Sequence, residues 1–165
     1  MLIRGKQRLL FGLIRLKNIS NRDLNHSSQI GMLGELIVKL YLSKYCDFVS
    51  STNDNCSYDL ILDQDGKLYR VEVKSANKTT TASGLRYRFQ ANRPKKSDLY
   101  MNCRPDIFAL VFFPKERIYF SPNINQRFYN FDQSPTVEEQ HQSLLDALFS
   151  INAVPTIKPL EDDAN

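Results

Sequence analysis

Apolar residues recur at two different periods along this 165-residue chain, and the two periods predict helices at either end of a run of strands. Over residues 31–45 they recur every three or four positions, which predicts an amphipathic helix with Ser27 or Ser28 as its N-cap. Glu35 falls at the edge of the apolar stripe. A second helix is expected over residues 136–149. The stripe of the first helix is assigned to Leu33, Leu36, Ile37, Leu40 and Tyr41.

Short runs rich in β-branched and aromatic residues separate the two predicted helices, and turn residues bound them, as is typical of strands. A polar loop is expected at residues 52–57, and the Thr- and Ser-rich stretch 78–84 is expected to be a mobile loop. The predicted strands are residues 48–51, 58–64, 67–75, 85–89, 106–113 and 117–120.

The dipeptide Asp65-Gly66 predicts a hairpin between the second and third strands. A type I′ turn needs positive φ at both central positions, and Asp-Gly between alternating apolar residues is a strong signal for it. With a two-residue loop, Gln64 faces Lys67 and every facing pair of residue numbers sums to 131. One face of the hairpin is then apolar and is predicted to join the core, namely Tyr58, Leu60, Leu62, Tyr69, Val71 and Val73.

The other face of the hairpin carries two opposed carboxylates, because this register puts Asp59 opposite Glu72. Like charges placed directly across a strand pair are destabilising unless something neutralises them, which suggests a divalent cation. Mg²⁺ takes one or two protein carboxylates together with water and phosphate oxygens. Lys74 follows Glu72 by two residues and shares its face. The alternative is a solvent face with an incidental acid pair, and a three-residue turn would put the two acids on opposite faces.

Composition limits the classes of protein that the chain can represent. No apolar run reaches the roughly 18 residues needed to span a bilayer, so we expect a soluble protein without a membrane partner. The three cysteines form no CxxC pair and the two histidines lack metal-ligand spacing, so any metal is expected on oxygen ligands. We expect a cytoplasmic protein without a small-molecule cofactor. We expect one domain over residues 1–165, with a core at about 28–122.

Charge is distributed unevenly along the chain, whose net charge is +4. Residues 1–22 hold six basic and no acidic residues, residues 66–104 hold ten basic residues against two acids, and residues 132–165 are acidic. Clustered cations suit a polyanionic partner, whereas the alternative is two solvated basic faces. Residues 2–16 predict a basic amphipathic helix that packs on the domain, lies along nucleic acid or serves as an organellar transit peptide.

A basic and aromatic segment supplies candidate contacts to nucleic acid. Arg86 and Arg88 alternate with aromatic residues, so a strand would present both guanidinium groups on one face, suited to a groove. The alternative is an edge strand that charge protects from aggregation. The further candidates, which suit phosphates, are Lys78, Arg93, Lys95 and Lys96.

The ordered set Gly31-x-x-Gly34-Glu35, Tyr58-Asp59 and Glu72-Val73-Lys74-Ser75 resembles the PD-(D/E)XK nuclease superfamily over roughly residues 28–122. Tyr58 stands where that family often has proline. The segments 106–109 and 117–120 look like those of restriction-fold homing endonucleases encoded in group I introns. Archaeal Holliday-junction resolvases are similar through the Gly-Glu helix and the hairpin.

The resemblance implies an α/β fold with a restriction-endonuclease-like αβββαβ core, a mixed central sheet and flanking helices. It also implies endonuclease activity on double-stranded DNA, dependence on Mg²⁺ or Mn²⁺, and a homodimer or homotetramer, for which residues 107–131 offer apolar surface. In this scheme Asp59, Glu72 and the Val73 carbonyl hold the metal, and Glu35 binds it through water or holds a second ion. Lys74 orients the attacking water. A Holliday-junction resolvase-like nuclease, an inactive DNA-binding protein of the same fold and a structural partner in a larger complex are the alternatives.

Overall fold

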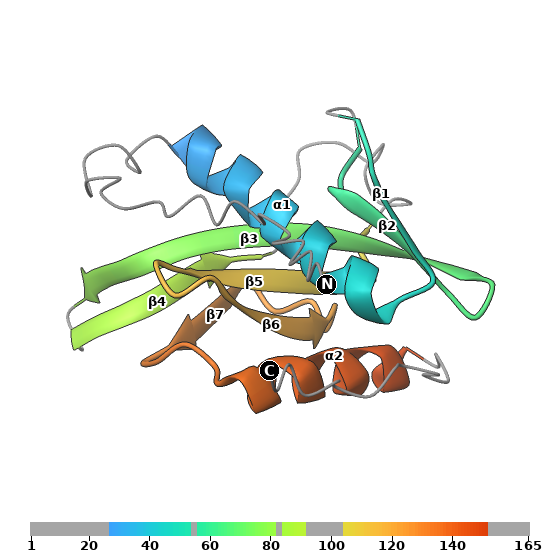
Figure 1. Ribbon diagram of the computed structural model, residues 1–165. Coiled ribbons are helices and arrows are strands. Elements are labelled where there is room, and N and C mark those ends of the chain that lie inside the picture. Colours follow the sequence, from blue (N-terminus) through green and yellow to red (C-terminus); the bar gives the residue numbers. More distant parts are fainter. Residues whose placement is uncertain (1–26, 54–55, 82–83, 92–103, 152–165) are drawn as a thin grey trace, which may run out of the picture.

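The computed structural model describes residues 27–53, 56–81, 84–91 and 104–151 as a mixed sheet with two helices (Figure 1). The predicted helix at 2–16 and the basic residues Arg93, Lys95 and Lys96 lie outside the described residues. No helix in the described part is long and apolar enough to cross a membrane. The elements are α1 (Ser27–Tyr45), β1 (Phe48–Ser51), β2 (Leu60–Gln64), β3 (Lys67–Thr81), β4 (Gly84–Gln90), β5 (Ile107–Phe113), β6 (Arg117–Pro122), β7 (Phe128–Phe131) and α2 (Val137–Ser150).

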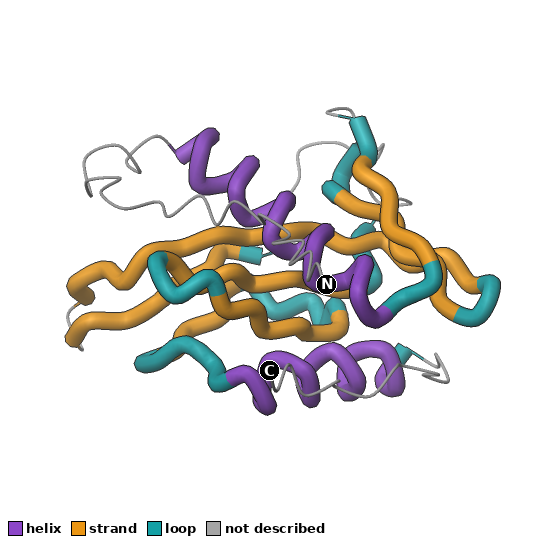
Figure 2. The backbone as a smooth tube through the Cα atoms, in the orientation of Figure 1, coloured by secondary structure: helices purple, strands orange, loops and turns teal. Residues whose placement is uncertain are grey.

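The long strand β3 organises the seven-stranded sheet (Figure 2). Strands β1, β2 and β3 form an antiparallel meander, β5 runs parallel to β3, and β6 returns antiparallel to β5. The far end of β3 pairs with β4, which pairs with β7. The expected helix, the three strands that follow it and the mixed sheet are confirmed, and β5 is the strand that runs parallel. The second core helix would fall between β4 and β5, where residues 92–103 are outside the described part.

The predicted register of the β2–β3 hairpin is confirmed. Its pairs run from Gln64 with Lys67 to Leu60 with Val71. Asp65 and Gly66 have φ values of 53° and 72°, as a two-residue type I′ turn requires. The turn therefore fixes which residues of β3 face the core.

The core has two parts, one on each face of β5. Every residue of β5 is buried, and successive side chains point to opposite faces. Ile107, Ala109 and Val111 pack with apolar residues of both helices, whereas Phe108, Leu110 and Phe112 pack with β4 and β7. Both described helices therefore cover one face of the sheet, and the ribbon of β4 and β7 covers the other. An apolar subunit interface was predicted over residues 107–131, and the part of it at residues 107–113 is wrong, because these residues are buried within the chain.

The predicted stripe of α1 is confirmed in part: Leu33, Ile37 and Tyr41 pack against the core, but Leu36 and Leu40 do not. Leu36 and Leu40 are 57% and 66% exposed, whereas Val38 and Leu42 are fully buried. The reason is Gly34, which brings the helix backbone against β3, so that positions 34, 38 and 42 face the sheet. Glu35 is partly buried at the edge of this face, as predicted. Ser27 and Ser28, the two N-cap candidates, are the first two residues of α1 in the described part.

The structure differs from the predicted strands in two further places. Strand β3 continues to Thr81 and pairs with β4, so residues 78–81, which were predicted to be part of a mobile loop, are strand. Threonine is β-branched and suits a strand, which explains the extension. Strand β7 was not predicted.

Helix α2 is confirmed and begins with a capping box. The backbone N–H of Glu139 donates to Thr136 Oγ1 at 3.1 Å, and the N–H of Thr136 donates to Glu139 Oε2 at 2.7 Å. Gln140 and Ser143 of this helix accept hydrogen bonds from backbone N–H groups of β6. The helix therefore covers the edge of the sheet that β6 forms.

Candidate active site

The candidate site lies along one edge of β3. Strand β2 pairs with residues 67–71 of β3 and β4 pairs with residues 78–81. Between them, residues 72–77 pair with β5 alone among the described strands. The opposite edge of this segment therefore offers backbone groups that no described strand uses.

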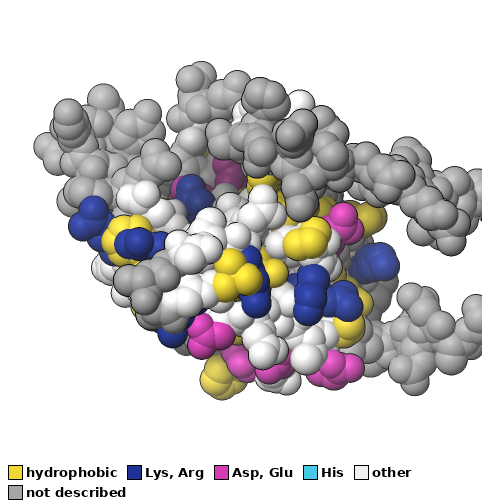
Figure 3. Space-filling view, turned by 90° about the vertical axis from the view of Figure 1, so that its left-hand side faces the viewer, with side chains coloured by type: hydrophobic (Ala, Val, Ile, Leu, Met, Phe, Trp, Pro, Cys, Tyr) yellow, Lys and Arg dark blue, Asp and Glu magenta, His cyan; other side chains and the backbone are white. Residues whose placement is uncertain are grey.

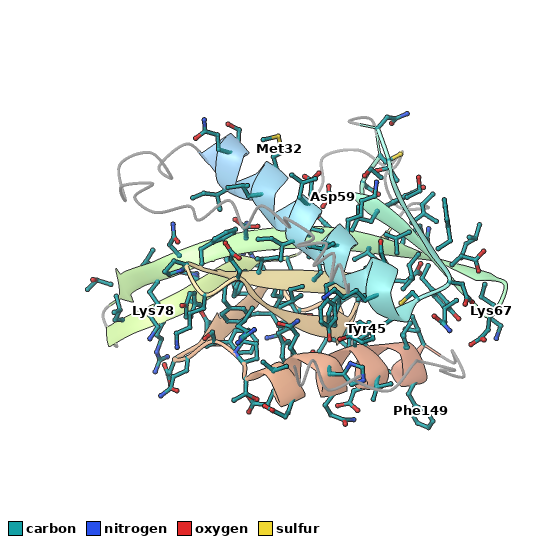
Figure 4. All side chains as sticks on the ribbon, viewed as in Figure 1. Met32, Tyr45, Asp59, Lys67, Lys78 and Phe149 are labelled. Carbon is teal, nitrogen blue, oxygen red and sulfur yellow. The ribbon has the colours of Figure 1, made fainter. Side chains whose placement is uncertain are left out.

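Asp59 occupies this edge with its side chain (Figure 4). The β2–β3 ladder ends at Leu60, and the Asp59 N–H donates to the carbonyl of Val71 at 2.9 Å. The Asp59 carboxylate accepts a hydrogen bond from the N–H of Val73 at 2.6 Å. The hairpin register predicted that Asp59 would pair directly opposite Glu72. The structure corrects this, because the ladder ends at Leu60 and Asp59 does not continue it. It lies against the backbone between Glu72 and Lys74.

The carbonyl of Val73 faces the same edge as its N–H group. The N–H and C=O groups of one residue point to the same side of a strand, which is why the hydrogen-bonded pairs of an antiparallel ladder exchange both bonds. Since the N–H of Val73 points to Asp59, its carbonyl oxygen lies on that side too. The carboxylate and the carbonyl therefore face the same edge.

Glu72 and Lys74 form an ion pair on one face of β3. Lys74 Nζ contacts Glu72 Oε1, and the two side chains are 29% and 20% exposed. Strand alternation brings them to the same face, as predicted. The pair holds an ammonium group beside the carboxylate at a solvent-accessible position.

Helix α1 brings Glu35 to the same part of β3. A Cβ atom added to Gly34 would overlap the hydroxyl of Ser75 and lie 3.3 Å from its Cβ atom, so the helix backbone touches β3 directly after Lys74. Only glycine allows this approach. In the motif Gly34-Glu35, the glycine therefore makes the close contact with β3. The contact brings the next residue, Glu35, near the segment of β3 that carries Glu72 and Lys74.

The donors at this edge suit a hard divalent cation. Within the described residues there is no group of three histidine, cysteine or acidic side chains in metal-binding geometry, so Glu35 does not form a three-carboxylate set with Asp59 and Glu72. Two carboxylates and one backbone carbonyl remain. Mg²⁺ usually takes one or two protein carboxylates and keeps several waters, so this donor set fits it.

The described basic residues that were predicted to contact nucleic acid lie on β4 and at the end of β3 that pairs with it. Arg86 and Arg88 alternate with the buried Tyr87 and Phe89 and so share one face, as predicted. Lys78 lies on β3, with its ammonium 5.5 Å from the centre of the Tyr87 ring. Seen from the end of the molecule where β3 and β4 meet, Lys and Arg side chains gather above a rim of acidic ones (Figure 3).

Sequence reasoning missed the ion pair between Arg70 and Asp106. Asp106 Oδ1 accepts from Arg70 Nη2 at 2.9 Å, and Oδ2 accepts from Nε at 3.1 Å and from the Arg70 backbone N–H at 2.8 Å. This pair fastens the start of β5 to β3, two residues before Glu72. No local signal marks it, because the partners are 36 residues apart in sequence.

Fold and site together define a nuclease of the restriction-endonuclease-like fold. A family model described as PD-(D/E)XK endonuclease matches residues 26–143, and the chain belongs to this family. The structure is similar to that of a bacterial homing endonuclease, I-Ssp6803I, with a TM-score of 0.55 and 20% sequence identity over 76% of this chain and 93% of that chain. No curated protein matches the chain. These findings confirm the resemblance inferred from the Gly-Glu helix and the hairpin.

Proposed function

We propose that this nuclease is a divalent-metal-dependent, site-specific endonuclease that hydrolyses phosphodiester bonds in double-stranded DNA. The observation that carries the proposal is the hydrogen bond from the N–H of Val73 to the Asp59 carboxylate, because Val73 lies between Glu72 and Lys74, which form an ion pair. Site specificity is supported by the likeness in fold to a homing endonuclease.

Asp59, Glu72 and the Val73 carbonyl are the residues that would hold Mg²⁺ or Mn²⁺. A bound divalent cation supplies Lewis-acid stabilisation of the charge that develops on the phosphate. The N–H of Val73 fixes one oxygen of Asp59 and leaves the other for a ligand. Glu35, on the neighbouring helix, would contact the site through water.

Lys74 would orient the attacking water. Its ammonium group has three donors and no acceptor, so it can hold a water by the oxygen and also stabilise negative charge on the phosphate. The contact with Glu72 keeps the ammonium at the site before substrate binds. Both groups lie on the rigid middle of β3, where β5 pairs with them.

We also propose that the enzyme acts as a homodimer or homotetramer. Each chain carries one set of Asp59, Glu72 and Lys74, and a duplex break needs hydrolysis on both strands. A two-fold dimer matches the pseudo-two-fold symmetry of duplex DNA. Light scattering at micromolar concentration should show an oligomer, and plasmid should be linearised in one encounter. A monomer that accumulates nicked circles would contradict this.

The test of the function is cleavage of three substrates by the full chain, namely supercoiled plasmid, linear duplex and a four-way junction, with Mg²⁺ or with EDTA. We expect the duplexes to be cut only with Mg²⁺, and Asp59→Asn to lose cleavage. Glu138→Gln removes a charge from an exposed acid of α2 and should cut normally, as a matched control. Cleavage in EDTA or by Asp59→Asn would refute the proposal. Cutting of the junction alone would indicate a resolvase, and binding without cutting an inactive DNA-binding protein.

A further inference from the structure

The ribbon formed by β4 and β7 has two chemically different faces. Tyr87 pairs with Phe131 and Arg88 with Asn130, so side chains alternate between an inner and an outer face. The inner face is aromatic and packs on β5, with the ring centres of Tyr87 and Phe112 4.8 Å apart. The outer face is polar and cationic and consists of Arg86, Arg88, Gln90, Phe128 and Asn130.

Two arginines stack on one aromatic ring of this outer face. The guanidinium carbon of Arg88 lies 4.2 Å from the centre of the Phe128 ring, and that of Arg127 lies 5.1 Å from it. Both arginines are exposed. Stacking on a ring face orients the planar guanidinium but leaves its N–H donors in the plane for a ligand. Arg88 is therefore an oriented donor at the surface.

Arg86 is held differently, although it shares the outer face. Its guanidinium forms an ion pair with Asp132, with Nε 2.8 Å from Asp132 Oδ1. This ion pair compensates the charge of Arg86. The two arginines of the segment are thus not equivalent, and Arg88 is the better candidate for contact with a ligand.

The outer face lies close to the candidate active site along β3, although on the other face of the sheet. Tyr87 pairs with Lys78, so Arg88 stands at the level of Asn77, three residues along β3 from Lys74 and on the opposite face of the strand. Three residues of a strand span about 10 Å. Along duplex DNA that is about three base pairs, since phosphates on one strand are spaced about 3.4 Å along the axis.

We propose that the outer face of the β4–β7 ribbon reads base edges in the major groove of the DNA, with Arg88 as the main reader and Gln90 and Asn130 beside it. The major groove admits a two-stranded ribbon, in which arginine pairs with guanine, and asparagine or glutamine with adenine. Phe128 is the residue that positions Arg88. The inference rests on the proposed function, because it takes duplex DNA as the substrate.

The test compares sequence preference between the wild type and variants of the ribbon. A library of randomised duplexes is enriched by binding to the full chain with Ca²⁺ and then cut with Mg²⁺, and the bound and the cut molecules are sequenced separately. Arg88→Ala should lose preference at one or two base pairs by about 5- to 100-fold. Phe128→Leu should lose part of the same preference, and Gln90→Ala should relax a different base pair.

Lys67→Ala is the matched control, because Lys67 lies at the opposite end of β3 from Lys78 (Figure 4). It should keep the wild-type preference, and melting curves should show that all variants are folded. Arg88→Ala overturns the inference if it keeps every preference and only weakens binding uniformly, since that is the behaviour of a phosphate contact. A wild type without any preference also overturns it. A wild type that selects sequences through Arg88 but never cuts would instead refute the proposed function alone.

Discussion

Replacing Gly34 with alanine tests whether the contact between α1 and β3 positions the site. The added Cβ atom would overlap the Ser75 hydroxyl, which can rotate away, but it would also lie 3.3 Å from the Ser75 Cβ atom, which cannot. Carbon atoms pack best at about 3.5–4.0 Å. Rotation of Ser75 therefore relieves only part of the overlap, and α1 must move away from β3 by a few tenths of an ångström.

Two opposed effects set the size of the change in stability. Alanine favours a helix interior by about 1 kcal/mol over glycine. Overpacking a closed contact costs about 1–3 kcal/mol. We therefore expect Gly34→Ala to lower the free energy of unfolding by about 1 kcal/mol. Adding Ser75→Ala removes the overlapping hydroxyl, a buried group without a hydrogen-bond partner among the described residues, so the double variant should be more stable than Gly34→Ala.

Urea denaturation of the wild type, both single variants and the double variant measures this coupling, which we expect at about 1–2 kcal/mol, within the range seen for residues in contact. Cleavage measured well below the melting temperature should fall in Gly34→Ala, because the helix carries Glu35 away from the site. Strictly additive effects, with Gly34→Ala more stable than the wild type, would show that helix propensity alone decides and that the close approach does not matter.

Three further predictions concern catalysis and pH. Lys74→Ala should lower the plasmid cleavage rate by at least about 10²-fold, because it removes a group that stabilises developing charge. DNA binding and folding should stay nearly intact, and normal turnover would contradict the role of Lys74. Ca²⁺ should support DNA binding in a filter assay but not cleavage, because it takes six to eight oxygens loosely whereas Mg²⁺ imposes a tight octahedron. Equal cleavage rates with Ca²⁺ and with Mg²⁺ would argue against this metal scheme. Burial lowers the pKa of His141 below its usual 6.5, so the folded state favours the neutral ring and loses stability as the pH falls below about 6.5. Melting temperatures from pH 8 to pH 5 should therefore fall less in His141→Gln than in the wild type, and parallel curves would contradict the assignment.

The parts of the fold that local chemistry determines could be predicted from the sequence. Asp65 and Gly66 are the residues that a type I′ turn requires, and the turn alone set the register of β2 and β3. The start of α2 is likewise determined locally, by Thr136 and Glu139, whose side chains accept hydrogen bonds from each other's backbone N–H groups. In both cases residues within a few positions of one another decide the structure.

Features that depend on distant contacts could not be predicted. Periodicity alone placed Leu36 in the core, and the structure exposes it because Gly34 meets Ser75, 41 positions further along the chain. Strand β7 is four residues long and its pairing with β4 has no local signal. Residue type and spacing identified the residues of the candidate site, but they did not predict where Asp59 lies relative to Glu72.

That position follows from the way β2 begins. Had Asp59 continued the ladder, β2 would have covered the edge of β3 at Val73, and a strand hydrogen bond would have used the backbone groups there. Instead Thr52 holds the preceding chain: its N–H donates to the Asp59 carbonyl at 2.9 Å and its hydroxyl to that of Tyr58 at 2.6 Å. The chain therefore enters β2 at an angle that leaves the edge to the Asp59 side chain. The carboxylate and the carbonyl of the proposed metal site share one edge because the strand pairing stops one residue earlier than the turn alone would dictate.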